Sequence, residues 1–375
     1  MRVGIDVKTL SLHKGGIGVF LRSVLPVLVS QDPGVRYVCF GPAEALEELP
    51  AEVGRVVVTL RDELKGRRIP FYDQVQLPRA LVAAGVDLFF SPYFDAPAAY
   101  RCPVIVTMHD AVHLRFPEFY PASQRFYYRT LMVYHGVHSA AVVTDSAFSK
   151  SELVQLAGIE PSRIHVIPLA LPPGFESTSS EEARSGIRKK HSLPADFVLY
   201  TGGAEARKNI STMLRAFGEW NGRSKSALPL VISGEAKRFA RWGEELGSLG
   251  IGKVVFLPGR MSGAELPDLY AAARAVIYPS LYEGFGFPLL EAMASGVPVA
   301  CSRRGSLPEI GQDAAVYFDP ENLDDMIGAL ERVTGEESVR ADLVRKGLVR
   351  AGEFSMGRTA DSLGRLFKSV GETCL

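Results

Sequence analysis

The sequence predicts an α/β protein of two domains, each built on a doubly wound parallel sheet. Three observations lead to this prediction. The chain has 375 residues and 47% apolar composition, enough for two hydrophobic cores. Short apolar runs of strand character alternate with helical segments, as they do in βαβ units. Several of these runs end in glycine-rich or polar turns, and ligands of such sheets bind at the carboxyl ends of the strands.

The composition argues against several classes of protein. The 42 basic and 42 acidic residues give a formal net charge of zero, whereas nucleic-acid binders are usually strongly basic. The four cysteines are scattered, so neither a disulfide framework nor a zinc site is expected, and a reducing compartment fits. The chain starts like a strand rather than a signal peptide, and no apolar run approaches the roughly 20 residues that span a bilayer. We therefore expect a cytoplasmic protein, and a peripheral contact with the inner face of the cell membrane stays open.

The first half of the chain contains a series of apolar runs that we expect to be strands: 3–6, 35–40, 55–58, 87–92, 104–108, 141–144 and 163–168. A polar loop after the first run leads to Gly15 and Gly16 at the start of a helix. This segment lacks the third glycine of a dinucleotide fingerprint, so it is weak evidence for NAD. The segment 71–84 contains Pro78 and is expected to be a broken or kinked helix.

Polar and aromatic residues follow the ends of these strands. Tyr93 comes after the run 87–92, and His109 and Asp110 come directly after the run 104–108. A histidine and an aspartate at a strand end are candidates for a binding site. His113 lies on the loop beyond, and Ser149 lies in a helix that begins after the run 141–144. The aromatic residues of the segment 126–134 are expected mainly in the core, with an acceptor or lipid surface as the alternative.

The second half contains two adjacent cations after a glycine turn. The strand expected at 197–200 ends in Gly202 and Gly203, and Arg207 and Lys208 precede a helix at 210–220. Cations at a helix N-terminus suit a diphosphate. The spacing of a P-loop is absent.

The most informative stretch is the segment 282–296, which follows an expected buried strand at 275–280. Gly284 and Gly286 make a tight turn, and Pro288 suits the first turn of a helix. The N-terminus of that helix favours an anion such as a diphosphate. Glu283 and Glu291 flank the turn, and carboxylates accept hydrogen bonds from sugar hydroxyls. A nucleotide sugar satisfies all of these features.

Together these segments resemble the family-four retaining glycosyltransferases, which have the GT-B fold of two Rossmann-like domains facing across a cleft. The stretch from Glu283 to Glu291 resembles the family's E-x7-E motif. The resemblance implies that Glu283 holds the donor sugar, Glu291 holds the nucleotide ribose, and Arg207 and Lys208 bind the leaving diphosphate. It gives His109 a contact with the donor sugar. It implies further donor contacts at Gly15, Gly16, Gly203, Gly284, Phe285, Gly286, Phe287 and Leu290. It leaves acceptor contacts to Tyr93, Asp110, His113 and Ser149.

The resemblance also implies the organisation and the activity. Residues 1–172 would bind the acceptor, residues 173–355 would bind the nucleotide sugar, and the helix 356–375 would cross back to the first domain. The chain looks most like bacterial mannosyltransferases of O-antigen and exopolysaccharide assembly. We therefore expect hexose transfer from GDP-mannose to a glycan or lipid-linked saccharide, with no metal or other cofactor. A UDP-sugar transferase, a nucleotide-sugar epimerase of the same fold and a non-catalytic sugar-nucleotide binding module are the alternatives.

Overall fold

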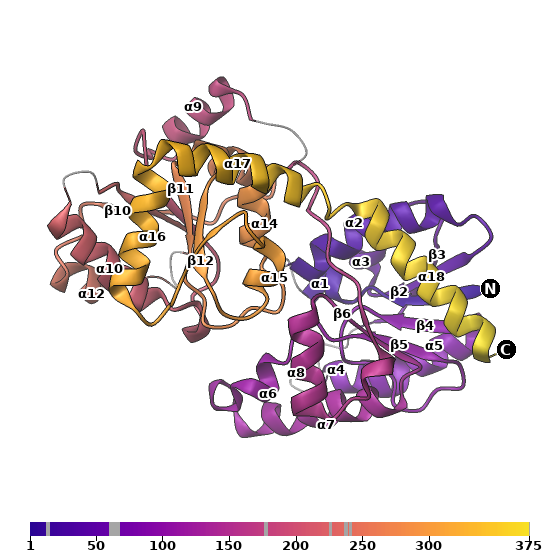
Figure 1. Ribbon diagram of the computed structural model, residues 1–375. Coiled ribbons are helices and arrows are strands. Elements are labelled where there is room, and N and C mark those ends of the chain that lie inside the picture. The colour runs from indigo at the N-terminus through magenta and orange to yellow at the C-terminus, as the bar shows by residue number, and fades with distance from the viewer. Residues whose placement is uncertain are drawn as a thin grey trace. The chain divides into compact units, whose positions relative to one another are not determined.

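The computed structural model describes residues 1–12, 16–59, 68–175, 179–224, 227–235, 239 and 242–374. Within these ranges the chain forms two compact units. The first unit is Met1–Pro172 together with Phe354–Leu375, and the second is Pro173–Glu353. Each unit carries one parallel sheet with helices packed around it (Figure 1). The predicted pair of doubly wound sheets is confirmed.

The first unit has a seven-stranded parallel sheet in the order β3-β2-β1-β4-β5-β6-β7. Its strands are β1 (Arg2–Asp6), β2 (Arg36–Gly41), β3 (Gly54–Val57), β4 (Leu88–Ser91), β5 (Val104–Thr107), β6 (Ala141–Thr144) and β7 (Ile164–Val166). The strand order reverses between β1 and β4. Ligands of open parallel sheets bind at such a reversal, outside the carboxyl ends of the strands.

Helices of the first unit connect these strands and cover the sheet. They are α1 (Thr9–Leu12), α2 (Gly16–Gln31), α3 (Ala43–Glu47), α4 (Arg68–Phe71), α5 (Leu77–Ala84), α6 (Val112–Arg115), α7 (Ala122–His138), α8 (Ala147–Ala157) and α18 (Met356–Cys374). The expected break near Pro78 takes the form of a π-helical turn, Tyr72–Gln76, between α4 and α5. Pro78 then stands in the first turn of α5, directly after this π-helical turn.

The last helix, α18, belongs to the first unit and packs against α2 (Figure 1). Its Phe367 is fully buried, and the ring centroid lies 5.2 Å from that of Phe90 on β4. The hydroxyl of Thr359 donates to the carbonyl of Pro168 at 2.9 Å. These contacts bind the end of the chain to the first unit, although Thr359 is 191 residues from Pro168 in sequence.

The second unit has a six-stranded parallel sheet in the order β10-β9-β8-β11-β12-β13. Its strands are β8 (Val198–Thr201), β9 (Leu230–Ser233), β10 (Val255–Gly259), β11 (Ala275–Tyr278), β12 (Val299–Ser302) and β13 (Val316–Phe318). Its helices are α9 (Glu181–Lys190), α10 (Ile210–Arg223), α12 (Gly243–Ser248), α13 (Leu266–Ala272), α14 (Phe287–Ala294), α15 (Leu307–Gly311), α16 (Leu323–Gly335) and α17 (Glu337–Ala351). The order reverses between β8 and β11, which are hydrogen-bonded neighbours.

Candidate functional site

The two informative motifs of the second half follow the two strands at which the sheet order reverses. Thr201 ends β8, and the 3₁₀ turn Ala206–Lys208 comes shortly after it. Tyr278 ends β11, and the turn that carries Glu283 follows. Because β8 and β11 are adjacent and parallel, both segments leave the sheet at the same edge. The fold therefore brings together residues about 75 positions apart.

Glu283 is held by both predicted cations. Its Oε1 lies 2.6 Å from Nζ of Lys208, and its Oε2 lies 3.2 Å from Nη1 of Arg207. Glu283 and Lys208 are each only 7% exposed. Burial raises the pKa of Glu283, but the two cations outweigh this effect and hold the pKa at about 2. Burial also lowers the pKa of Lys208 from its ordinary value. The site is thus a buried, ionised cluster with two cations and one anion.

The glycine turn after Glu283 is held by the loop before α15. Gly286 has φ of 106°, a left-handed conformation, and a Cβ there would lie 2.7 Å from Cδ2 of Leu307. The hydroxyl oxygen of Ser306 lies 2.7 Å from the carbonyl oxygen of Phe285 and 3.1 Å from that of Glu283, and its one proton is shared between these two acceptors. Helix α14 then begins at Phe287 with Pro288 in its first turn, as predicted. Its positive N-terminal end lies next to the cation cluster and adds to the attraction for an anion.

Glu291 lies one turn into α14 in a different electrostatic setting. Its Oε2 accepts a hydrogen bond of 2.7 Å from the hydroxyl of Tyr270 on α13. Burial raises the pKa of Glu291 to about 7, and the bond from Tyr270 offsets only part of that rise. The hydroxyl of Tyr270 also meets Oγ1 of Thr201 at the end of β8. Tyr270 and Thr201 could not be predicted as site residues, because nothing in the sequence of α13 marks its tyrosine as a partner of α14.

The other predicted donor residues occupy varied positions. The rings of Phe285 and Phe287 contact each other with centroids 5.3 Å apart. Gly203 accepts a hydrogen bond of 2.8 Å from the hydroxyl of Tyr200 through its carbonyl. The side chain of Leu290 is fully buried, and its N–H donates to the carbonyl of Gly286. A donor contact at Leu290 therefore stays a prediction. In the first unit, Gly16 is exposed at the start of α2, whereas Gly15 lies outside the described residues.

His109 is paired with Asp145 rather than with its neighbour Asp110. Its Nδ1 lies 2.8 Å from Oδ2 of Asp145, and its Nε2 lies 3.1 Å from the carbonyl of Pro92. Strands β5 and β6 are adjacent, so the residues that follow them meet. Burial lowers the pKa of His109, but Asp145 outweighs it and the pKa is raised. Both ring nitrogens face acceptors, which fits a protonated imidazolium.

The predicted acceptor residues follow β4, β5 and β6 and have partners within the first unit. Oδ1 of Asp110 accepts the backbone N–H of Val112 at 3.0 Å at the start of α6. Ser149 is fully buried, and its hydroxyl donates to the carbonyl of His109. The ring of Tyr93 is tilted against that of Phe94 with centroids 4.2 Å apart, and His113 packs against Tyr128 with ring centroids 4.3 Å apart. Asp110 and Ser149 thus have structural bonds, and an acceptor role for either stays a prediction.

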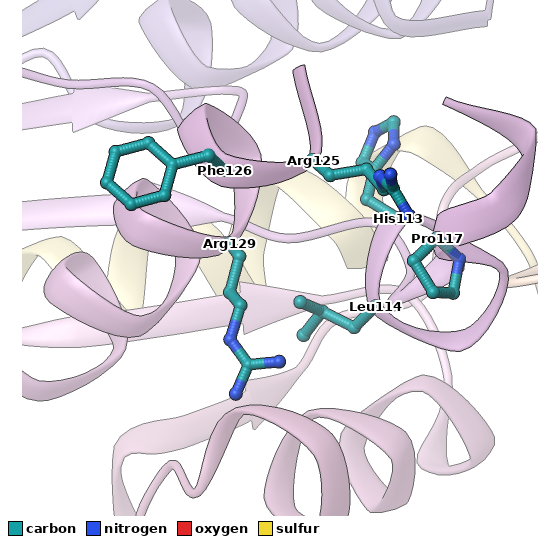
Figure 2. Close-up of a pocket in the computed structure, with 6 residues that line it drawn as sticks. All are labelled: His113, Leu114, Pro117, Arg125, Phe126 and Arg129. Carbon is teal, nitrogen blue, oxygen red and sulfur yellow. The ribbon is translucent and has the colours of Figure 1, made fainter. Parts of the chain in front are cut away.

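A pocket of about 260 Å³ opens beside His113 (Figure 2). It is lined from α6, the following 3₁₀ turn and α7 by His113, Leu114, Pro117, Arg125, Phe126 and Arg129. The side chain of Phe126 is 76% exposed. The expectation of core packing is therefore wrong for Phe126, whereas Tyr127 and Tyr128 of the same helix pack against the hydrophobic core.

A buried charge cluster at the strand reversal of the first unit escaped the sequence analysis. Nζ of Lys8 lies 2.7 Å from Oδ2 of Asp6, 2.7 Å from Oδ1 of Asp73 and 3.1 Å from Oδ1 of Asp95. Burial raises the pKa of Asp6 and of Asp73. Asp6 at the end of β1 and Lys8 shortly after it are polar residues at a strand end, which was a usable signal for both. Asp73 and Asp95 carry none, since they approach through tertiary packing.

The described ranges contain no group of three or more His, Cys, Asp or Glu side chains that could hold a metal ion. Among the helices that the structure describes, none has both the length and the apolar character needed to cross a bilayer.

Solved structures share this fold over nearly the whole chain. Sucrose-phosphate synthase from Thermosynechococcus elongatus is 18% identical with a TM-score of 0.79, and the match covers 100% of both chains. Anabaena HepE, solved in complex with UDP-glucose, is 15% identical with a TM-score of 0.76 and covers 98% of this chain and 100% of its own. These likenesses show that the chain has the GT-B fold of such enzymes.

Sequence comparisons give the family. Residues 184–349 match the family described as Glycosyl transferases group 1, and residues 14–173 match Glycosyltransferase Family 4. O-antigen chain mannosyltransferase B from Escherichia coli is 34% identical over 275 residues, covering 72% of this chain and 70% of its own. Serotype-specific mannosyltransferase WbdA from Escherichia coli is 28% identical, but the match covers only 34% of its length. The chain therefore belongs to the family-four glycosyltransferases.

Proposed function

We propose that this glycosyltransferase moves mannose from GDP-mannose to a hydroxyl of a glycan or lipid-linked saccharide, with retention of the anomeric configuration. The observation that carries the proposal is the meeting of Arg207 and Lys208 with Glu283 beside the N-terminus of α14. Two cations and a helix N-terminus suit the diphosphate, and the carboxylate suits sugar hydroxyls. The similarity to O-antigen chain mannosyltransferase B supports mannose as the sugar.

The chemistry follows from where negative charge develops. The bond between the sugar C1 and the phosphate oxygen breaks, and a bond between C1 and the acceptor oxygen forms on the same face. The acceptor proton passes to the departing phosphate. Lys208 and Arg207 stabilise the departing diphosphate by exchanging part of their contact with Glu283 for contact with phosphate oxygens. Glu283 then keeps its charge for the hydroxyls of the sugar, because its pKa of about 2 leaves it ionised.

The proposed reaction needs no metal ion, since the cations and the helix N-terminus supply the positive charge that a metal supplies elsewhere. Turnover should therefore be unchanged by EDTA. Loss of turnover with EDTA, recovered by added Mg²⁺ or Mn²⁺, would contradict this part of the proposal.

A donor panel tests the sugar nucleotide. Thermal shift and turnover are measured with GDP-mannose, UDP-glucose and other GDP- and UDP-sugars, because a ligand that binds only the folded state raises the melting temperature. We expect the largest shift and the turnover with GDP-mannose, and an α-linked product by NMR. A larger shift with UDP-sugars would favour the alternative donor, to which the fold of HepE with its bound UDP-glucose lends support.

The exposed face of α7 carries apolar side chains and arginines that bear on the acceptor. Phe126, Val133 and Val137 are 76%, 36% and 50% exposed, and their spacing of seven and four residues places them on one stripe of the helix. Arg125 and Arg129 flank that stripe, and α7 contains no acidic residue. An apolar stripe with arginines beside it suits the surface of an anionic lipid bilayer. We propose that this face holds the enzyme at a membrane that carries its lipid-linked acceptor.

Vesicle flotation tests this surface. The protein should float with phosphatidylglycerol-containing vesicles and stay behind with pure phosphatidylcholine vesicles. Phe126→Ser, or Arg125→Glu with Arg129→Glu, should weaken binding by about fivefold or more, since each arginine near an anionic surface contributes about 1 kcal/mol. The matched control is Val349→Ser on α17, which is 66% exposed and lies in the other unit. Equal binding by all variants would remove the membrane role from α7.

A further inference from the structure

Glu291 depends on a buried tyrosine that the family motif does not include. The hydroxyl of Tyr270 donates to Oε2 of Glu291 at 2.7 Å. A phenol has one proton, so the other contact of this hydroxyl, with Oγ1 of Thr201, must run the other way, with Thr201 donating. The three residues therefore form a chain with one direction, from the end of β8 through α13 to α14.

The place of Tyr270 in the fold is rigid. The residue is fully buried, and its ring packs edge-on against Phe175 with centroids 5.9 Å apart. Thr201 is 7% exposed and ends a central strand of the sheet. A hydroxyl fixed in this way holds one carboxylate oxygen of Glu291 in place. Within the described part of the chain, the hydrogen bond of Glu291 uses Oε2, and Oε1 can accept hydrogen bonds from a ligand.

The hydrogen bond from Tyr270 also affects the charge of Glu291. Glu291 differs from Glu283 in that burial dominates its pKa, and the hydrogen bond from Tyr270 favours its charged form. Ribose hydroxyls are donors and need a charged acceptor to bind strongly. Loss of the phenol proton donor would weaken both the placement and the charge of that acceptor.

We propose that Tyr270, supported by Thr201, is a positioning residue that holds Glu291 for the ribose of the nucleoside diphosphate. This inference rests on the proposed function, because it takes Glu291 as the ribose contact. Tyr270 does not touch the reacting atoms. Its removal should weaken nucleotide binding and leave turnover at saturating donor nearly unchanged.

The experiment compares GDP with 2′,3′-dideoxy-GDP, which keeps the base and the diphosphate but lacks both ribose hydroxyls. Binding of each is measured by calorimetry for the wild type, Glu291→Gln, Tyr270→Phe and Thr201→Val. We expect Tyr270→Phe to weaken GDP binding about tenfold and Thr201→Val to weaken it less. Binding of dideoxy-GDP should be the same for all four proteins, since it has no hydroxyl for Glu291 to hold.

The matched control is Tyr317→Phe on β13, in the same unit. The hydroxyl of Tyr317 is buried and has no hydrogen-bond partner in the part of the chain that the structure describes, so its removal should leave GDP binding unchanged. If Tyr270→Phe is too unstable to measure, Thr201→Val still tests the hydrogen-bond series from Thr201 through Tyr270 to Glu291, with the tyrosine in place.

The two possible failures differ. If Glu291→Gln weakens GDP binding but Tyr270→Phe and Thr201→Val do not, the positioning role of Tyr270 is refuted and the ribose contact of Glu291 stands. If Glu291→Gln weakens the binding of GDP and of dideoxy-GDP equally, or of neither, Glu291 is not the ribose contact. The ribose contact and the positioning role of Tyr270 are then both refuted. If Tyr270→Phe alone weakens the binding of GDP and of dideoxy-GDP equally, the substitution damages the site in general. That result would also refute the positioning role.

Discussion

Two glutamates eight residues apart show how strongly the surroundings set the charge of a side chain. Glu283 lies against Lys208 and Arg207, and its pKa is about 2. Glu291 is buried near a tyrosine, and its pKa is about 7. The sequence predicted both residues as site residues through one motif. It could not predict the difference, because Lys208 and Tyr270 reach them only in the folded sheet.

Substitution of Glu291 should change the pH dependence of stability. Its folded pKa of about 7 is above the ordinary 4.5, so its contribution to stability is full below pH 4.5 and is lost as the pH rises through about 7. Glu291→Gln removes this loss. The free energy of unfolding of the variant, relative to wild type, should rise by on the order of 2 kcal/mol between pH 5 and pH 8, as urea titrations can measure.

Glu283→Gln is the control for that prediction. The pKa of Glu283 is lowered, so its contribution to stability is present above pH 4.5 and is lost only as the pH falls through about 2. Its variant should therefore differ from wild type by a constant amount between pH 5 and pH 8. The account would be contradicted if the stability difference between Glu283→Gln and wild type changed with pH in this range. It would also be contradicted if the difference between Glu291→Gln and wild type did not change.

Lys208 should act mainly on turnover. Its Nζ contacts Glu283 and the hydroxyl of Tyr278 and would stabilise the departing diphosphate. We expect Lys208→Ala to lower kcat about a hundredfold and to change KM for the donor only a few-fold. Lys253→Ala, an exposed lysine of the same unit, should behave like wild type in steady-state assays. An unchanged kcat for Lys208→Ala would remove its role on the leaving group.

Among the elements, α14 was predicted well because its signals are local. The glycine turn, Pro288 in the first turn and Gly296 at the end fix its limits without reference to the rest of the fold. The orientation of α7 was not predictable in the same way. Phe126, Tyr127 and Tyr128 are consecutive and point to different sides of the helix, so tertiary packing decides which of them is exposed.

The loop before α15 should be as important to the site as the motif itself. Gly305 has φ of 67°, and a Cβ there would lie 2.8 Å from the backbone N and O of Glu283. Gly305→Ala should destabilise the protein by about 2 kcal/mol and lower activity, because the turn that carries Glu283 must move. Urea unfolding and a turnover assay measure the two effects.

Gly328→Ala is the matched control for that element. Gly328 lies within α16, and a Cβ there meets no atom within 4 Å. Since alanine favours the helix over glycine, this variant should be more stable by about 0.5–1 kcal/mol with unchanged activity. Equal stability of the two variants would mean that a glycine at position 305 is not needed for the close contact with the backbone of Glu283.

For the whole molecule, alternation of strands and helices was enough to predict two parallel sheets. The strand orders required the structure, and they explain why the site forms where it does. In the second sheet the order reverses between β8 and β11, and the motifs after these strands meet there. In the first sheet it reverses between β1 and β4, beside the buried cluster of Lys8 with its three aspartates.

The central claim is that the second unit binds a nucleoside diphosphate at the reversal between β8 and β11. The most direct measurement is a crystal structure of the full chain with GDP. The account predicts phosphate oxygens within hydrogen-bond distance of Arg207, Lys208 and the start of α14, and ribose hydroxyls on Glu291. A diphosphate bound away from Arg207 and the start of α14 would contradict it.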